Sequence, residues 1–154
     1  MQRNQMCKLN LPAFDIRLQE VDGQTKIFDV LRRRYVSLTP EEWVRQHFVH
    51  YLINYKHYPT TLLANEVPLR IGEKQIRADS VLYDKSLHGR MIIEYKAPDV
   101  RLTQKVFDQI STYNLLLHVD YLVISNGLQT YACRMDYVNQ KYIFIREIPD
   151  YENL

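Results

Sequence analysis

Residues 76–83, IRADSVLY, and residues 91–96, MIIEYK, are the part of the sequence that says most about the fold of this chain. Both stretches contain the β-branched and aromatic residues that are typical of β-strands. Between them, residues 84–89 read DKSLHG, in which Asp, Ser and Gly are turn formers. The sequence therefore predicts an antiparallel hairpin that extends from residue 76 to residue 96.

This predicted hairpin brings three charged side chains close together. Asp79 and Glu94 lie in adjacent strands, so we expect their carboxylates to approach each other. Because side chains alternate along a strand, Glu94 and Lys96 share one face and Tyr95 points to the other. Carboxylates are hard oxygen ligands that suit a divalent metal ion activating water beside a phosphate. The hairpin therefore predicts a metal site with an ammonium group beside it.

The same residues also allow a purely structural interpretation. A Glu-x-Lys triplet arises easily at average composition, and as a same-face ion pair it would only solvate the edge of a strand. The neighbouring Ile92 and Ile93 argue against this interpretation, because a charge in apolar surroundings is costly without a partner or a metal ion. The residues alone leave both interpretations open.

Composition places the chain among compact domains. It has 154 residues, of which 46% are hydrophobic, with only 4 Gly and 6 Pro, so we expect one domain with a sizeable core. The 12 Tyr are compatible with stacking on nucleic acid or with half-buried strands. A net charge of +2 does not by itself indicate a polyanionic partner. The densest basic run, residues 32–34, is typical of a solvated face.

Several features favour a cytoplasmic location. Cys7 and Cys133 lack CxxC spacing, which fits a reducing compartment and gives neither a disulfide framework nor a zinc site. No apolar stretch follows the N-terminus, so we expect no signal peptide. The longest apolar tract is broken by His118 and Asp120, so we expect no membrane span.

The first helix has a clear start signal at residues 39–42, TPEE. Thr39 is a natural N-cap, Pro40 suits the first helical position, and Glu42 completes a capping box. Apolar residues at helical spacing continue to about Lys56. We interpret Glu42 as a capping residue, with a catalytic acid as the alternative.

The remaining elements follow in an order that favours a mixed sheet. The sequence predicts a hairpin within 13–30, strands over 62–69, 76–83 and 91–96, a helix over 103–117, a strand over 121–125, and short strands over 130–134 and 142–147. A helix between two strands is the connection that a parallel pair requires. We therefore predict an α/β fold with a mixed central sheet flanked by helices. Within one domain over 1–154, we expect an N-terminal extension (1–38), a core (39–127), and closing strands with a tail (128–154).

The second helix carries a further pair of candidate residues. Gln109 and Tyr113 are four residues apart and share one face of the helix. A Gln can donate and accept hydrogen bonds, and a Tyr ring can lie against a sugar or a base. Alternatively, Tyr113 is half core and Gln109 is solvated. Glu66, on the preceding strand, would approach the metal site if the strands align.

As a set, these motifs resemble the PD-(D/E)xK nuclease superfamily, whose core has the same order of helix, three strands, helix and strand. Residues 34–46 (RYVSLTPEEWVRQ) look like the first-helix signature of the N-terminal nuclease domain of type I restriction enzyme R subunits. Residues 94–98 (EYKAP) look like its catalytic strand, and residues 107–114 (FDQISTYN) like its Q-x-x-x-Y helix. Residues 123–127 (VISNG) resemble the strand that follows this helix in the family. The resemblance as a whole covers residues 27–135.

The resemblance implies a restriction-endonuclease-like fold and hydrolysis of DNA with Mg²⁺ or Mn²⁺ as cofactor. It implies that Asp79, Glu94 and the backbone carbonyl of Tyr95 bind the metal, and that Lys96 orients or polarises the attacking water. The remaining candidates are Glu42, Glu66, Gln109 and Tyr113 in supporting roles, and Arg32, Arg34 and Lys105 as nucleic-acid-binding residues.

The sequence departs from the family pattern in two ways. Ala78 stands where the superfamily has Pro, which matters little because Asp79 supplies the chemistry. Type I R subunits carry an ATP-driven translocase after this domain, so we expect coupling to translocation to need a separate translocase or specificity polypeptide. The main alternative is a non-catalytic nucleic-acid-binding or partner-docking module with the same fold. A protein-interaction subunit without a nucleic-acid role is disfavoured by the intact acid–acid–lysine set.

Overall fold

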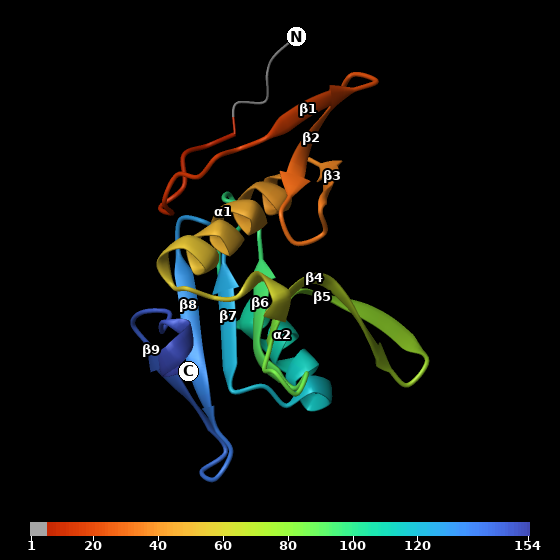
Figure 1. The fold of residues 1–154 in the computed structure, drawn as a ribbon. Helices are drawn as coiled ribbons and strands as arrows, with labels where there is room; N and C mark the ends of the chain where they lie inside the picture. Colours follow the sequence, from red (N-terminus) through yellow and green to blue (C-terminus); the bar gives the residue numbers. More distant parts are fainter. Residues whose placement is uncertain (1–5) are drawn as a thin grey trace.

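A six-stranded mixed sheet forms the centre of the molecule (Figure 1). The computed structural model describes residues 6–154, apart from the side chains of Tyr113 and Leu115. The strands lie in the order β4 (Leu63–Ile71), β5 (Lys74–Tyr83), β6 (Gly89–Tyr95), β7 (Tyr121–Ser125), β8 (Thr130–Asp136) and β9 (Lys141–Ile145). Only β6 and β7 pair in parallel. The predicted hairpin of residues 76–96 is the antiparallel pair β5–β6.

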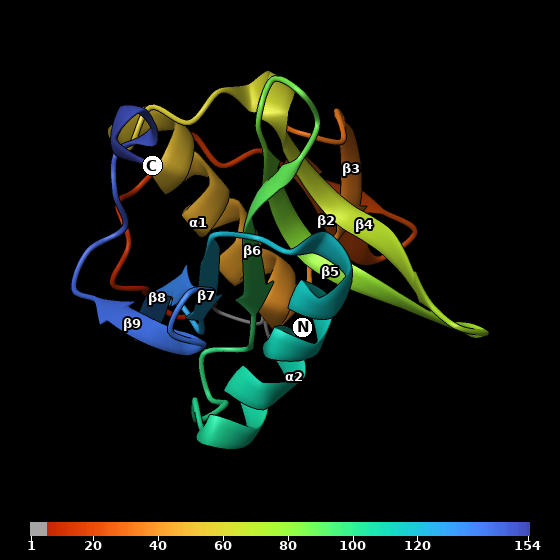
Figure 2. The same ribbon diagram turned by 90° about the horizontal axis from the view of Figure 1, so that it is seen from below.

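The two helices cover opposite faces of this sheet (Figures 1 and 2). Helix α2 (Gln104–Leu117) makes the crossover that the parallel pair β6–β7 requires. Alternate residues of β6 point to opposite faces, so Ile93 packs with the core of α1 (Pro40–Tyr55), whereas Ile92 packs with that of α2. The predicted α/β fold with a mixed sheet flanked by helices is confirmed.

A smaller three-stranded sheet lies beside the N-terminal end of α1 (Figure 1). It contains β1 (Leu18–Val21), β2 (Gln24–Asp29) and β3 (Arg34–Ser37), and the turn between β1 and β2 confirms the predicted N-terminal hairpin. The interpretation of residues 32–34 as a solvated face is wrong for Arg32, whose side chain is only 18% exposed, whereas Arg33 and Arg34 are exposed. Arg32 and Arg33 lie in the turn between β2 and β3, where Arg33 has a φ of 52°.

Both ends of the described chain are hydrogen-bonded to the core. The backbone N–H of Asn10 donates to the carbonyl of Gly127 at 2.8 Å, which attaches the N-terminal segment to the turn between β7 and β8. The Tyr58 hydroxyl donates to the carbonyl of Pro149 at 3.0 Å. Short 3₁₀ helices occupy Thr60–Leu62 and Tyr151–Asn153. In the described part of the chain, no helix has the length and apolar character needed to cross a membrane.

Candidate metal centre and its ion-pair network

The β5–β6 register places Asp79 beside Glu94. Ser80 pairs with Ile93 in this antiparallel ladder, so Asp79, which precedes Ser80, lies across from Glu94, which follows Ile93. The backbone N–H of Tyr95 donates to Oδ2 of Asp79 at 2.9 Å and fixes that carboxylate against β6. Lys96 Nζ lies 3.8 Å from Glu94 Oε1. The structure thus brings together the two acids and the lysine that the hairpin pattern predicted.

Glu94 is a buried carboxyl group with an unsatisfied oxygen. Its residue is 6% exposed, and its Oε2 atom has no hydrogen-bond partner. Burial and the adjacent Asp79 raise the pKa of Glu94 to about 8, although Lys96 opposes the change. Burial also raises the pKa of Asp79, against the lowering effect of the Tyr95 amide and of Arg45. Two carboxyls so close together favour a shared proton or a bound cation.

The donor set fits a hydrated divalent ion. Mg²⁺ is usually bound by one or two carboxylates, with waters and substrate phosphates completing its coordination. Asp79 and Glu94 supply two such carboxylates, and the unsatisfied Oε2 of Glu94 is a ligand atom without another partner. Among the residues that the structure describes, no group of three or more His, Cys, Asp or Glu could hold a metal ion. The residues therefore fit a partly hydrated ion and do not form an all-protein cage.

Glu66 lies near this pair but is bound elsewhere. The β4–β5 ladder pairs Asn65 with Ser80 and Val67 with Ala78, so the intervening Glu66 faces Asp79. Glu66 has a φ of 56°, in the left-handed region that non-glycine residues adopt at a cost of about 1–3 kcal/mol. Its Oε1 accepts a hydrogen bond from Arg45 at 2.5 Å. Glu66 therefore lies near the acidic pair, as expected, but the guanidinium of Arg45 contacts both Glu66 and Asp79.

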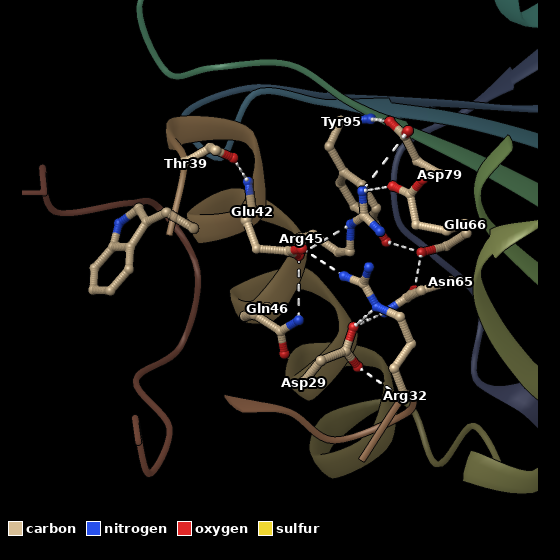
Figure 3. Close-up of polar contacts among 12 residues, drawn as sticks. Asp29, Arg32, Thr39, Glu42, Arg45, Gln46, Asn65, Glu66, Asp79 and Tyr95 are labelled. Carbon is tan, nitrogen blue, oxygen red and sulfur yellow. Dashed lines mark hydrogen bonds and ion pairs between the residues drawn. The ribbon is translucent and has the colours of Figure 1, made fainter. Parts of the chain in front are cut away.

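Arg45 is the central residue that the sequence analysis missed (Figure 3). Its side chain is 7% exposed, and its Nη2 lies 2.5 Å from Glu66 Oε1 and 3.9 Å from Asp79 Oδ1. Its Nε lies 3.2 Å from Glu42 Oε2, and its guanidinium carbon lies 5.8 Å from the centroid of the Tyr95 ring. The spacing of Glu42 and Arg45, three residues apart on one helix, was the signal that could have indicated the pair.

The partners of the Glu42 carboxylate contradict its interpretation as a capping residue. Thr39 is the N-cap as predicted, since its Oγ1 accepts from the backbone N–H of Glu42 at 3.1 Å. The carboxylate of Glu42, however, pairs with Arg32 at 2.5 Å and with Arg45, and accepts from Gln46 Nε2 at 3.3 Å (Figure 3). Its expected bond to the Thr39 amide is wrong, because charged donors are stronger partners for a buried carboxylate. Glu42 thus contacts Arg45, whose Nη2 lies 3.9 Å from Asp79 Oδ1.

A second chain of contacts joins the β2–β3 turn to the metal-centre strands. Arg32 Nε lies 2.5 Å from Oδ2 of the fully buried Asp29. Asn65 Nδ2 donates to the same oxygen at 2.9 Å, and the Ser80 hydroxyl donates to Asn65 Oδ1 at 2.6 Å. The Tyr95 hydroxyl donates in turn to Ser80 at 2.9 Å. Arg32 is therefore engaged inside the protein, and its predicted contact with nucleic acid is still a prediction.

The other predicted site residues lie on the surface or outside the described part. Gln109 and Lys105 are exposed on α2, and Arg34 is exposed at the start of β3. In the described part of the structure, Gln109 makes no hydrogen bond to Asp79 or Glu94. The side chain of Tyr113 lies outside the described residues. The roles expected of these residues remain predictions.

The chain has recognisable relatives. Residues 40–149 match the family described as the type I restriction enzyme R protein N terminus (HSDR_N). No curated protein matches the chain significantly.

One solved structure is similar in fold. It is described as a fragment of an HsdR subunit of a type I restriction enzyme from Vibrio vulnificus YJ016. It is 14% identical to this chain, with a TM-score of 0.52 over 73% of the chain. The chain spans only 24% of the length of that protein. At this identity, the likeness establishes a shared mixed α/β fold, consistent with the restriction-endonuclease-like fold that the sequence resemblance implied.

Proposed function

Because this chain belongs to the family of type I restriction enzyme R protein N termini, we propose that it is an endonuclease domain that hydrolyses DNA phosphodiester bonds with a divalent metal ion. One observation carries the proposal: the half-buried carboxyl of Asp79 and the buried carboxyl of Glu94 converge, with Lys96 Nζ 3.8 Å from Glu94. Family membership supports a nuclease over other metal-dependent hydrolases.

Asp79 and Glu94 would hold Mg²⁺ or Mn²⁺, with the backbone carbonyl of Tyr95 as a further ligand. When bound, such an ion supplies a water of lowered pKa and neutralises charge on the phosphate. The Tyr95 N–H orients Asp79, since it donates to Oδ2 at 2.9 Å. Lys96, whose side chain is 23% exposed, donates to the attacking water or to a phosphate oxygen as negative charge develops there.

DNA would bind through exposed cations. We assign phosphate contacts to Arg34 and Lys105, both exposed. Arg32 is bound to Asp29 and Glu42, so we assign it the role of holding the β2–β3 turn in place. Gln109 and Tyr113 would position the DNA strand from α2. Because the R subunit is part of a type I restriction enzyme, we propose that the chain works in the cytoplasm with a translocase or specificity polypeptide.

Nicking of supercoiled plasmid tests this function. We expect nicking by the wild-type chain with Mg²⁺ or Mn²⁺ and none with EDTA. Lys96→Ala and Glu94→Gln should each lower the rate by about 100-fold or more, because their charges act where the transition state develops charge. Lys85→Ala is the matched control, since Lys85 is exposed in the β5–β6 turn. This variant should nick at the wild-type rate.

Two results would contradict the proposal. Equal nicking by wild-type and Lys96→Ala proteins would assign the activity to a contaminant or to another site. DNA binding in gel-shift assays without metal-dependent cleavage would instead support a non-catalytic binding module. Circular dichroism of each variant excludes loss of activity through unfolding.

A further inference from the structure

We propose that the guanidinium of Arg45 is a permanent cation between Glu66 and Asp79, so that the acidic centre binds one divalent ion and not two. This inference rests on the proposed function, because it takes Asp79 and Glu94 as ligands of an ion. It assigns Arg45 as a positioning residue and removes Glu66 from the ligand set.

Geometry supports this role for Arg45. A single nitrogen, Nη2, lies 2.5 Å from Glu66 Oε1 and 3.9 Å from Asp79 Oδ1. A second metal ion shared by these two carboxylates would need the same space and would be repelled by the guanidinium. Arg45 is held from the other side by Glu42, 3.2 Å from its Nε. Its side chain is 7% exposed, so it cannot turn to solvent without breaking these contacts.

The charge balance of the centre leaves room for one divalent ion. When Asp79 and Glu94 are both ionised, as metal ligands are, three largely buried cations lie among five carboxylates, which leaves an excess of two negative charges. The cations are Arg32, Arg45 and Lys96, and the carboxylates are Asp29, Glu42, Glu66, Asp79 and Glu94. Arg77 lies 3.6 Å from Glu66, but its side chain is 71% exposed, so solvent screens its charge. One divalent ion neutralises the excess, and a second would reverse it.

Arg45 keeps its charge because a guanidinium is not deprotonated in proteins. The carboxylates of Glu42, Glu66 and Asp79 lie around it and favour its charged form. Because its Nη1 is buried without a hydrogen-bond partner, the side chain does not face the solvent where a phosphate would bind. Arg45 therefore neutralises Glu66 and Asp79, whereas Lys96 is the cation available to substrate.

The stoichiometry of Mn²⁺ binding tests the inference, with the metal alone as the probe. Free Mn²⁺ is measured by electron paramagnetic resonance during titration. We expect one ion per wild-type chain and two per Arg45→Met chain, because removal of the guanidinium releases Glu66. The double variant with both Arg45→Met and Glu66→Gln should again bind one Mn²⁺ ion per chain. Arg77→Met, which removes an exposed partner of the same glutamate, should also bind one ion.

A second experiment compares the Mn²⁺ affinities of variants in which Arg45 is unchanged. It tests whether Glu66 is a metal ligand even if Arg45→Met does not fold. Glu66→Gln should change the wild-type Mn²⁺ affinity by less than about threefold, whereas Glu94→Gln should weaken it by more than about tenfold. Any of three results would overturn the inference. These are binding of two ions by the wild type, binding of one ion by a folded Arg45→Met protein, and equal losses of Mn²⁺ affinity in Glu66→Gln and Glu94→Gln. Absence of Mn²⁺ binding by the wild type would instead refute the proposed function on which it rests.

Discussion

Replacing Glu94 by Gln should stabilise the metal-free protein at alkaline pH. The unsatisfied carboxylate of Glu94 is buried beside Asp79, and its pKa is raised from an ordinary value of 4.5 to about 8. The folded protein therefore binds this proton more tightly than the unfolded chain does. The resulting stability is fully present below pH 4.5 and is lost as the pH rises through about 8.

The size of the effect follows from the change in pKa. Each pKa unit corresponds to about 1.4 kcal/mol, so a rise from 4.5 to about 8 sets an upper bound of about 5 kcal/mol on the loss. Because Asp79 shares the proton, we expect a smaller loss for the wild type, about 2–4 kcal/mol between pH 5 and pH 9. Glu94→Gln has no charge to desolvate at this position, so its stability should change less over the same range.

Urea unfolding in EDTA at several pH values measures this difference. Glu41→Gln is the control, since Glu41 is exposed at the start of α1, and it should follow the wild-type profile. Adding Mg²⁺ at pH 8 should stabilise the wild type by about 2.7 kcal/mol at a hundredfold excess over its Kd. At the same Mg²⁺ concentration it should stabilise Glu94→Gln by less than about 1.4 kcal/mol, because the affinity of this variant is more than tenfold weaker.

Parallel pH profiles for the wild type and Glu94→Gln would refute this reasoning, because they would mean that burial of Glu94 costs no free energy. Equal stabilisation of both proteins by Mg²⁺ would place the ion at another site.

Three further predictions follow from the same structure. Glu42→Gln should lower the free energy of unfolding by about 2–4 kcal/mol in urea titrations, because it removes one carboxylate partner from each of the two largely buried guanidiniums of Arg32 and Arg45. A loss below about 1 kcal/mol would mean that these two ion pairs contribute little to stability. Gly127→Ala should destabilise the fold by about 1–3 kcal/mol in thermal unfolding, because the φ of Gly127 is 82° and a Cβ there would lie 2.7 Å from a methyl carbon of Leu9. Gly72→Ala should cost less, because the space around Gly72 is open. Arg34→Ala and Lys105→Ala should each reduce the log–log salt slope of duplex binding by about 0.9, and an unchanged slope would remove that residue from the interface.

Sequence patterns were sufficient to predict both helices, the six strands of the central sheet and the acid–acid–lysine set, but not β3. The turn residues 84–89 specify the β5–β6 hairpin, and its register places Asp79 across from Glu94. Thr39 and Pro40 specify the start of α1 because a cap and a fixed φ act within one turn. The crossover by α2 followed from the order of strand, helix and strand. All of these signals act between residues that are close in sequence, so they can be identified before the chain is folded.

The pairing of the surrounding charges could not be predicted from the sequence. Arg45 lies on α1, and its partners Glu66 and Asp79 come from β4 and β5, so no local spacing connects them. Glu42 has the spacing of a capping residue, but folding brings Arg32 and Arg45 to its carboxylate. A buried carboxylate gains more from a charged donor than from a backbone amide, because low local polarity strengthens charge–charge attraction. The outcome therefore depends on which elements pack together, and that becomes known only when α1, the β2–β3 turn and the central sheet have assembled.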